Sequence, residues 1–309
     1  MGRFGNAALL ITGLTMVLPL AVPQQPASEP PVVFRSDVRL VRLLATVKDL
    51  NGRLVGDLDR AEFTILDNGV SQDIAVFEKY TEQPLSIALL MDTSASISKD
   101  LKIATASVKK FVQSVIQEGN PADEVALFTF NHQVQQHTDY TRRLGQIDRR
   151  VQPLKAEAGT SLYDALWFAA RSLEGRPGRH VIVVITDGGD TTSTYRYHDA
   201  LEAAHKADAP IYSIMLMPIT NDPGRNIGGE NALFSLAAST GGQRFLPSVG
   251  AELDQALSDI LRDLRTQYLI GYYPKNLPRT RERFHSVRVD VTRRDLRAVT
   301  RSGYYGDAQ

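Results

Sequence analysis

Oxygen-bearing side chains stand at three separated places in the chain, each next to the end of an expected strand or helix. An unbroken apolar run, Ser86–Met91, stops at an aspartate that is followed by two alternate serines. A second apolar run, Val181–Ile185, also leads to an aspartate, and a threonine precedes an expected helix between the two runs. The five side chains are Asp92, Ser94, Ser96, Thr160 and Asp187. Magnesium prefers near-octahedral oxygen coordination and retains waters, so two carboxylates and three hydroxyls predict a site for a hard divalent cation.

The elements that must position these side chains form an alternating series of strands and helices. An apolar run without polar alternation suits a strand covered on both faces, and the groups at the carboxyl ends of such strands form the crevice of an open α/β sheet. The strands and helices expected here are Ser86–Met91, helix Leu101–Val115, Val125–Phe130, a weak strand around Val134, helix Leu144–Val151, helix Leu162–Leu173, Val181–Ile185, helix Asp199–Ala207, Ile211–Met217, a loop at Asn221–Gly229, helix Ala232–Ser239, Gln243–Leu246 and helix Leu253–Leu264. The pattern predicts an α/β fold with a doubly wound, mainly parallel, Rossmann-like sheet.

Period-two alternation marks both flanks of this α/β region. The patterns are Val41–Val47, a turn at Asn51-Gly52, Phe63–Leu66, a turn at Asp67-Asn68-Gly69, Ile74–Phe77, Tyr268–Tyr273 and His285–Val291. Such alternation around Asn-Gly turns is typical of β hairpins. Because both flanks are β, we expect them to pair into one small all-β, sandwich-like domain in which the α/β domain is inserted. The expected boundaries are residues 33–82 and 266–306 for the β domain and 85–264 for the α/β domain.

Composition describes an ordinary globular chain of 309 residues with 43% hydrophobic and 23% charged residues. Lys+Arg and Asp+Glu balance at 35 each, which disfavours nucleic acid as a partner. A basic stretch in the last 35 residues is interpreted as a solvated sheet face rather than a site for an anionic polymer, because few aromatic residues interleave it. We expect four tyrosines, Tyr272, Tyr273, Tyr304 and Tyr305, to pack the β domain. Absence of cysteine excludes a disulfide framework.

The first residues have the composition of a targeting segment. Residues 1–24 contain Arg3 followed by the largely apolar Ala7–Val22, which is short for a membrane span and is typical of a signal peptide. Residues 25–32 are rich in Pro and polar residues and predict a disordered leader. We therefore expect an exported bacterial protein, periplasmic or extracellular. An uncleaved N-terminal anchor is the alternative, and no later membrane segment is expected.

Three motifs together resemble the von Willebrand factor A family. Asp92-Thr-Ser-Ala-Ser96 is similar to its D-x-S-x-S element, Gly159-Thr160 to its threonine element, and Thr186-Asp-Gly-Gly-Asp190 to its T-D-G element. The resemblance spans about Leu85–Leu264, and the flanks look like those of exported bacterial relatives. It implies a metal-ion-dependent adhesion site (MIDAS) that binds Mg²⁺ or Mn²⁺.

The resemblance also implies a role for each site residue. Ser94 and Ser96 would bind the metal directly, Asp92 mainly through water, and Thr160 and Asp187 directly or through water. An Asp or Glu carboxylate of a protein partner would complete the shell. Asp190 is expected nearer the surface, where it would support a ligand residue rather than bind the metal itself. Ala95 stands where many relatives have glycine and is small enough for the loop.

Other interpretations of the same residues stay open. Ser94, Ser96 and Ser98 are also suitable helix caps, Ser161 with Asp164 forms a capping-box pattern, and Asp187-Gly188-Gly189 is a common turn sequence. Asp92-Thr-Ser94 also resembles the active-site triplet of aspartic proteases, but those paired acids lie on β lobes, whereas both acids here are followed by helices. We therefore expect a binding module with no catalytic residues, and an assembly scaffold with an idle metal site is the alternative.

Overall fold

The computed structural model of the chain describes residues 40–79, 82–151, 154–216, 227–277 and 283–306. Val38–Gln309 forms one compact unit. The expected signal peptide at residues 1–24 and leader at residues 25–32 lie outside the described residues.

A six-stranded sheet forms the centre of the α/β domain, as predicted, with the strand order β10-β9-β8-β5-β6-β7. The strands are β5 (Leu85–Asp92), β6 (Glu124–Phe130), β7 (Val134–Gln136), β8 (Arg179–Thr186), β9 (Ile211–Met215) and β10 (Arg244–Phe245). All neighbours pair in parallel except the edge strand β7, which is antiparallel to β6. Every residue of β5 and β8 is buried, which is the pattern expected of strands covered on both faces.

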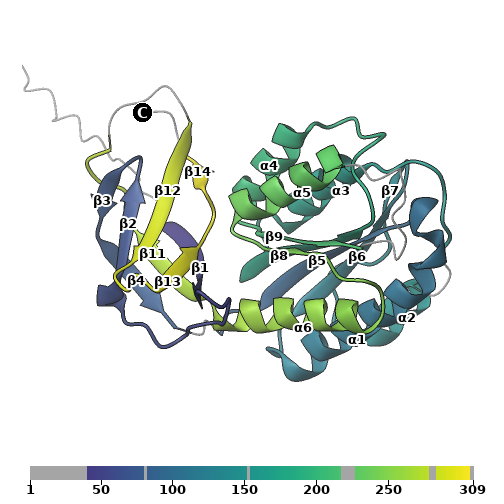
Figure 1. Ribbon diagram of the computed structural model, residues 1–309, viewed down its shortest axis with the longest axis horizontal. Coiled ribbons are helices and arrows are strands. Elements are labelled where there is room, and N and C mark those ends of the chain that lie inside the picture. Colours follow the sequence, from purple (N-terminus) through teal and green to yellow (C-terminus); the bar gives the residue numbers. More distant parts are fainter. Residues whose placement is uncertain (1–39, 80–81, 152–153, 217–226, 278–282, 307–309) are drawn as a thin grey trace, which may run out of the picture. The chain divides into compact units, whose positions relative to one another are not determined.

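Helices cover both faces of this sheet (Figure 1). The helices are α1 (Leu101–Glu118), α2 (Leu144–Val151), α3 (Leu162–Leu173), α4 (Tyr197–Lys206), α5 (Ile227–Thr240) and α6 (Ala251–Thr266), with a 3₁₀ turn, η2, at Ser96–Lys99. Alternate β5 residues serve different cores: Leu89 packs in the core with α1 and α6, and Leu90 in the core with α3, α4 and α5. The sheet is therefore doubly wound, with helices packed on each side.

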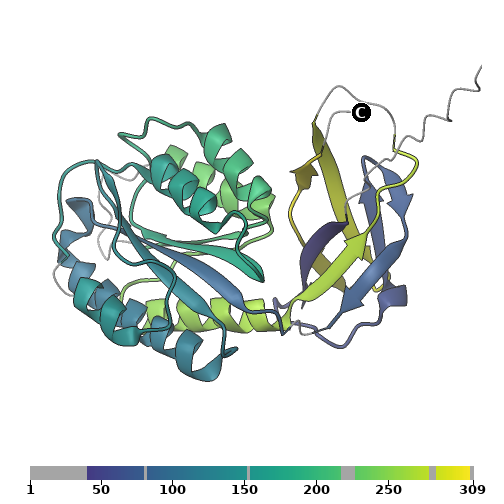
Figure 2. The same cartoon turned by 180° about the vertical axis from the view of Figure 1, so that it is seen from behind.

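Strands from both flanks build the β domain, in which two four-stranded sheets face each other (Figure 2). The elements are β1 (Val41–Asp49), η1 (Arg60–Glu62), β2 (Phe63–Asp67), β3 (Val70–Gln72), β4 (Ile74–Glu78), β11 (Tyr268–Tyr272), β12 (Phe284–Val291), β13 (Leu296–Val299) and β14 (Gly303–Tyr305). The sheet orders are β13-β1-β11-β4 and β14-β12-β2-β3. The chain leaves the β domain after β4 and returns to it at β11. These two strands pair antiparallel, so the α/β domain is inserted between neighbouring strands.

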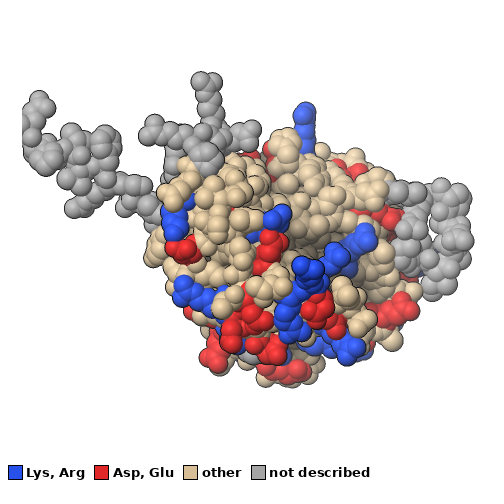
Figure 3. Space-filling view, turned by 60° about the vertical axis from the view of Figure 1, so that its left-hand side comes forward, with Lys and Arg blue, Asp and Glu red and all other residues tan. Residues whose placement is uncertain are grey.

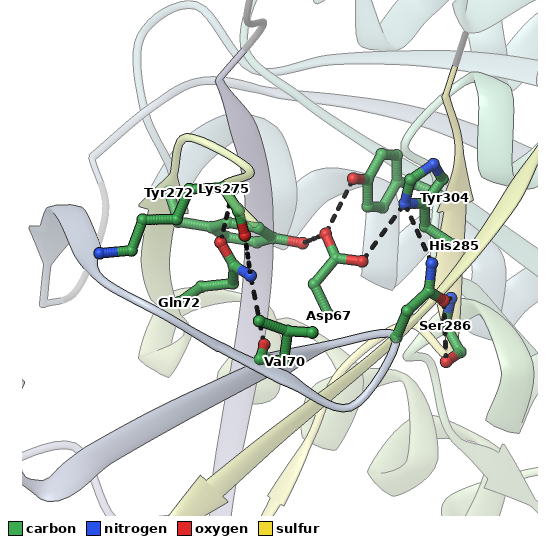
Figure 4. Close-up of polar contacts among 9 residues, drawn as sticks. Asp67, Val70, Gln72, Tyr272, Lys275, His285, Ser286 and Tyr304 are labelled. Carbon is green, nitrogen blue, oxygen red and sulfur yellow. Dashed lines mark hydrogen bonds and ion pairs between the residues drawn. The ribbon is translucent and has the colours of Figure 1, made fainter. Parts of the chain in front are cut away.

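A buried carboxylate ties the two β sheets together (Figure 4). Asp67, at the end of β2, is fully buried, and its Oδ2 accepts hydrogen bonds from the hydroxyls of Tyr272 at 2.8 Å and Tyr304 at 2.9 Å. Its Oδ1 lies 3.3 Å from Nδ1 of His285. Burial, together with the neighbouring Asp67 carboxylate, raises the pKa of Tyr272 far above its usual value. The tyrosine therefore stays a donor to Asp67.

The structure corrects several details of the predicted elements. Helix α5 begins at Ile227, inside the loop expected at Asn221–Gly229, and has two glycines in its first turn; residues 221–226 of that loop lie outside the described residues. Helix α1 has Asp100 as its N-cap residue, without a side-chain capping bond, so Ser98 does not cap it. Tyr273 is 53% exposed instead of packed, and it lies just after the last residue of β11.

The surface of the β domain carries charges of both signs. Figure 3 shows basic and acidic residues interspersed on one face, where no large area has a single sign. Several arginines of the basic C-terminal stretch pair locally, as Arg288 does with Asp290 at 2.9 Å. None of the helices in the described part of the chain is long and apolar enough to cross a membrane.

Candidate metal centre

The carboxyl ends of two adjacent parallel strands bring Asp92 and Thr186 together. Asp92 is the last residue of β5 and Thr186 the last of β8, and the two strands pair in register up to Met91 and Ile185. Parallel neighbours end at the same edge of a sheet, so the hydroxyl of Thr186 donates to Asp92 Oδ2 at 2.5 Å. Asp92 is fully buried, and its Oδ1 accepts the backbone N–H of Ser94 at 2.7 Å. The Asp92 carboxylate is therefore fixed by contacts from the end of β8 and from the loop after β5.

A chain of hydroxyl groups links the loop after β5 with Asp187. The hydroxyls of Ser94 and Ser96 are 3.0 Å apart, and Ser96 Oγ donates to Asp187 Oδ1 at 2.9 Å. Ser94 is buried, whereas Ser96 is exposed and Asp187 is half-buried. Four of the five expected site residues thus form one continuous cluster that is open to solvent at Ser96 and Asp187.

The threonine segment joins the other two loops through the backbone. Glu157 N donates to the carbonyl oxygen of Thr93 at 2.9 Å, and Thr191 N donates to the carbonyl oxygen of Thr160 at 2.8 Å. Thr160 is 7% exposed and immediately precedes Ser161, the N-cap residue of α3. Its hydroxyl takes no part in the hydrogen bonds that link Asp92, Ser94, Ser96 and Asp187 within the described residues.

Both carboxylates of the cluster lack a cationic partner. Burial raises the pKa of Asp92 to about 6, although hydrogen bonds from Thr186 and Ser94 oppose this effect. Burial also raises the pKa of Asp187, and the nearby Asp100 carboxylate adds to the shift. Neither Asp92 nor Asp187 belongs to any of the ion pairs that the described residues form. The site therefore has an excess of negative charge.

Asp190 and Asp164 hold the loop that follows the T-D-G element. Asp190 Oδ1 accepts the hydroxyl of Ser193 and the backbone N–H of Tyr163, the latter at 3.3 Å. The capping-box interpretation of Ser161 and Asp164 is wrong, because Ser161 makes no side-chain capping bond. Asp164 instead accepts the backbone N–H groups of Thr194 at 2.9 Å and Tyr195 at 2.7 Å. These two acids therefore fix the loop rather than contact the four-residue cluster.

Sequence analysis missed the supporting side chains of the site. The T-D-G element includes Thr186 without a role of its own, although its position at a strand end beside Asp92 is a usable signal. Thr191 and Thr192 belong to no motif, yet Thr191 Oγ1 accepts the N–H of Thr160 at 2.9 Å, and Thr192 Oγ1 lies 2.8 Å from Ser161 Oγ. Their role depends on how two distant loops meet, which local patterns do not specify.

The donor set fits a hard divalent cation. Carboxylate and hydroxyl oxygens are the ligands of Mg²⁺, and an unpaired, buried Asp92 beside Asp187 provides the negative charge that a cation would neutralise. The described residues include no group of three or more His, Cys, Asp and Glu side chains arranged to hold a metal ion. A cation at this site would therefore need the serine and threonine hydroxyls.

Comparisons with known proteins concern the α/β domain. Among solved structures, the conserved hypothetical protein BatB from Bacteroides thetaiotaomicron is 18% identical, with a TM-score of 0.46 over 58% of this chain and 98% of that chain. The vWF domain of the type V pili tip protein Mfa5 from Porphyromonas gingivalis is 14% identical, with a TM-score of 0.46 over 59% of this chain and 95% of that chain. The PilB minor pilin from Streptococcus sanguinis is 15% identical, with a TM-score of 0.47 over 60% and 62%.

These solved structures share too little with the chain to define its function. No curated protein matches the chain. Residues 87–189 match the family model of the von Willebrand factor type A domain, and this span includes the loop after β5, the threonine segment and the end of β8. Residues 87–189 are therefore similar to the von Willebrand factor type A domain, as the resemblance of the three motifs predicted.

Proposed function

We propose that the chain is an exported, metal-dependent protein-binding module with no catalytic role. Asp92, Ser94, Ser96, Thr160 and Asp187 would hold Mg²⁺ or Mn²⁺, and a partner's Asp or Glu carboxylate would complete the shell. The observation that carries the proposal is the hydroxyl-linked pair Asp92 and Asp187, which has no cationic partner.

Exposure and charge support this use of the site. Ser96 is exposed and Asp187 half-buried, so a bound cation would stay accessible to a partner, while the buried Asp92 anchors the site. Hydroxyl ligands are neutral, so a cation held by two carboxylates and three hydroxyls stays electrophilic enough to bind a further anionic oxygen. The ion would supply electrostatic attraction to the partner's carboxylate, and the protein's residues would hold and orient that ion.

Metal binding is tested first, without any partner. Titration of the metal-free chain with Mn²⁺, followed by electron paramagnetic resonance, should show one saturable site. Asp187→Asn should weaken Mn²⁺ binding at least about tenfold, because loss of a direct ligand should cost more than loss of a residue that only supports a ligand. Asp139→Asn, at an exposed carboxylate, is the matched control and should bind as the unchanged chain does. Equal Mn²⁺ affinity in both variants would contradict the proposed ligand set.

Partner binding separates this proposal from the assembly scaffold with an idle metal site. Proteins of the cell envelope should copurify with the chain in Mg²⁺ and be lost in EDTA or with Asp187→Asn. A partner retained equally in EDTA would support the scaffold instead. The remote alternative, an aspartic-protease-like hydrolase, predicts casein cleavage at acid pH that Asp92→Asn abolishes.

A further inference from the structure

A small cavity lies at the end of β8 opposite to the metal centre. Its volume is about 50 Å³, and its lining includes Arg179, His205, Asp208 and Arg301. Arg179 is the first residue of β8 and Thr186 the last, so a strand of about 3.3 Å per residue puts roughly 23 Å between them. Nothing bound in this cavity would touch the metal centre.

Arg179 is a buried cation without a counter-ion. The residue is 5% exposed, and its Nη1 donates to the carbonyl oxygen of Leu264 at 2.6 Å and to Oε1 of Gln267 at 3.2 Å. Its Nε is buried without a hydrogen-bond partner, and Arg179 forms no ion pair within 4.0 Å in the described part of the chain, although the Asp123 carboxylate attracts it from farther away. Burial lowers the pKa of Arg179 to about 10, which still leaves the guanidinium charged at neutral pH. A buried, unpaired charge is strongly disfavoured, and an anion in the cavity would relieve that cost.

Two neighbouring side chains, Arg301 and His205, also line the cavity. Arg301 pairs with Asp208 and donates from Nη2 to the carbonyl oxygen of Arg42 at 2.9 Å, but its Nε is buried without a partner. His205 is 3% exposed and also lines the cavity. Burial, with the Arg301 charge, lowers the pKa of His205 to about 4, so its ring is neutral at pH 7.

Charge and size together define the ligand. The cavity lining carries the cations Arg42, Arg179 and Arg301 and one carboxylate, Asp208, which is already paired with Arg301. A water molecule needs about 10–15 Å³ of cavity volume, so this cavity of about 50 Å³ holds roughly four waters or one group of similar size. Guanidinium donors favour phosphate and carboxylate oxygens.

We propose that this cavity binds a small oxyanion, such as phosphate, through the guanidinium groups of Arg179 and Arg301, which line it. The proposal does not depend on the metal centre, and the tests can therefore be done in EDTA. The oxyanion is either free or the terminal group of a larger phosphate ester, and glycerol 3-phosphate distinguishes these sources. Acetate measures whether a planar carboxylate is accepted equally well.

The test is calorimetric titration of the full chain with phosphate against sodium chloride of equal ionic strength. Saturable phosphate binding is expected, and Arg179→Gln should weaken it about tenfold or more, since a charge-assisted hydrogen bond is lost. Arg288→Gln, at an exposed arginine paired with Asp290, is the matched control and should bind normally. Heat changes that chloride reproduces, or equal binding by Arg179→Gln, would overturn the proposal.

A second measurement uses the unchanged chain. The ring resonances of His205 should shift saturably on addition of phosphate, with the same dissociation constant as the calorimetry. Binding of glycerol 3-phosphate that equals or exceeds that of phosphate would identify an ester, and binding of phosphate alone would identify the free ion. An unshifted His205 at saturating phosphate would overturn the site even if Arg179→Gln did not fold.

Discussion

Replacement of Asp92 by asparagine should stabilise the metal-free protein at neutral pH. Asp92 is fully buried, its pKa rises from a usual value near 4 to about 6, and it has no cationic partner. Since the folded-state pKa is raised for an acid, folding favours the protonated form, and ionisation of Asp92 destabilises the fold as the pH increases. A rise of two pKa units corresponds to a destabilisation of the folded state by roughly 3 kcal/mol at pH 7, and about half of this destabilisation remains at pH 5.

Asparagine keeps the shape of Asp92 and carries no charge, so Asp92→Asn removes this pH-dependent cost. In EDTA at pH 7 its unfolding midpoint should exceed that of the unchanged chain by roughly 6–12 °C, at about 2–4 °C per kcal/mol. The difference should decrease as the pH falls toward 4. Thermal unfolding followed by circular dichroism measures it, with the exposed Asp139→Asn as the control.

Magnesium should reverse the order of stability. The ionised Asp92 binds the cation, so Mg²⁺ should stabilise the unchanged chain more at pH 7 than at pH 5, by RT ln(1 + [Mg²⁺]/Kd). Asp92→Asn should gain little from Mg²⁺ at either pH. An Asp92→Asn variant that unfolds below the unchanged chain at pH 7 in EDTA would refute the reasoning, because it would show that the charge of Asp92 stabilises the empty site.

Three further substitutions test the packing that supports the two domains. Asp67→Asn should destabilise the fold by about 3 kcal/mol, because two buried tyrosine hydroxyls lose a charged acceptor, and chemical denaturation against Asp290→Asn measures this. Gly178→Ala should cost more than about 1 kcal/mol in the same assay, since Gly178 has φ +85° and a new Cβ would lie 2.3 Å from the carbonyl oxygen of Pro84. Asp164→Ala should release the loop whose Tyr195 ring stacks on Trp167 at 4.2 Å, so the fluorescence of this single tryptophan should change; an unchanged spectrum would contradict the role of Asp164.

Much of the fold was predictable because the polarity pattern of each segment matches the burial of its residues in the structure. The apolar runs of β5 and β8 contain no polar alternation, and both strands are covered by helices on each face. The hairpin at Asp67-Asn68-Gly69 was equally direct, since Asn68 and Gly69 adopt φ of +46° and +80°, which this turn requires. Helix α5 was harder to bound, because Gly228 and Gly229 usually indicate a loop and here occupy its first turn.

The polar contacts were less predictable than the elements. Asp67 was interpreted as a turn residue, and nothing near it in the chain indicated that Tyr272 and Tyr304, more than 200 residues later, would donate to it. The alternation of strand β2 places Asp67 on the buried face, but the partners come from the other flank. Short β13 and β14 were also missed, since they carry little periodicity of their own.

Strand β8 shows why the two candidate sites need separate ligands. Arg179 at its first residue is a buried cation without an anion, and Asp187 just after its last residue lies with Asp92 in a site without a cation. At roughly 23 Å and an effective dielectric constant near 20, their attraction is only about 0.7 kcal/mol, far below the cost of burying either charge unpaired. Neither end can neutralise the other. The two proposed ligands, a cation at one end and an oxyanion at the other, are each complementary to the charge at their own site.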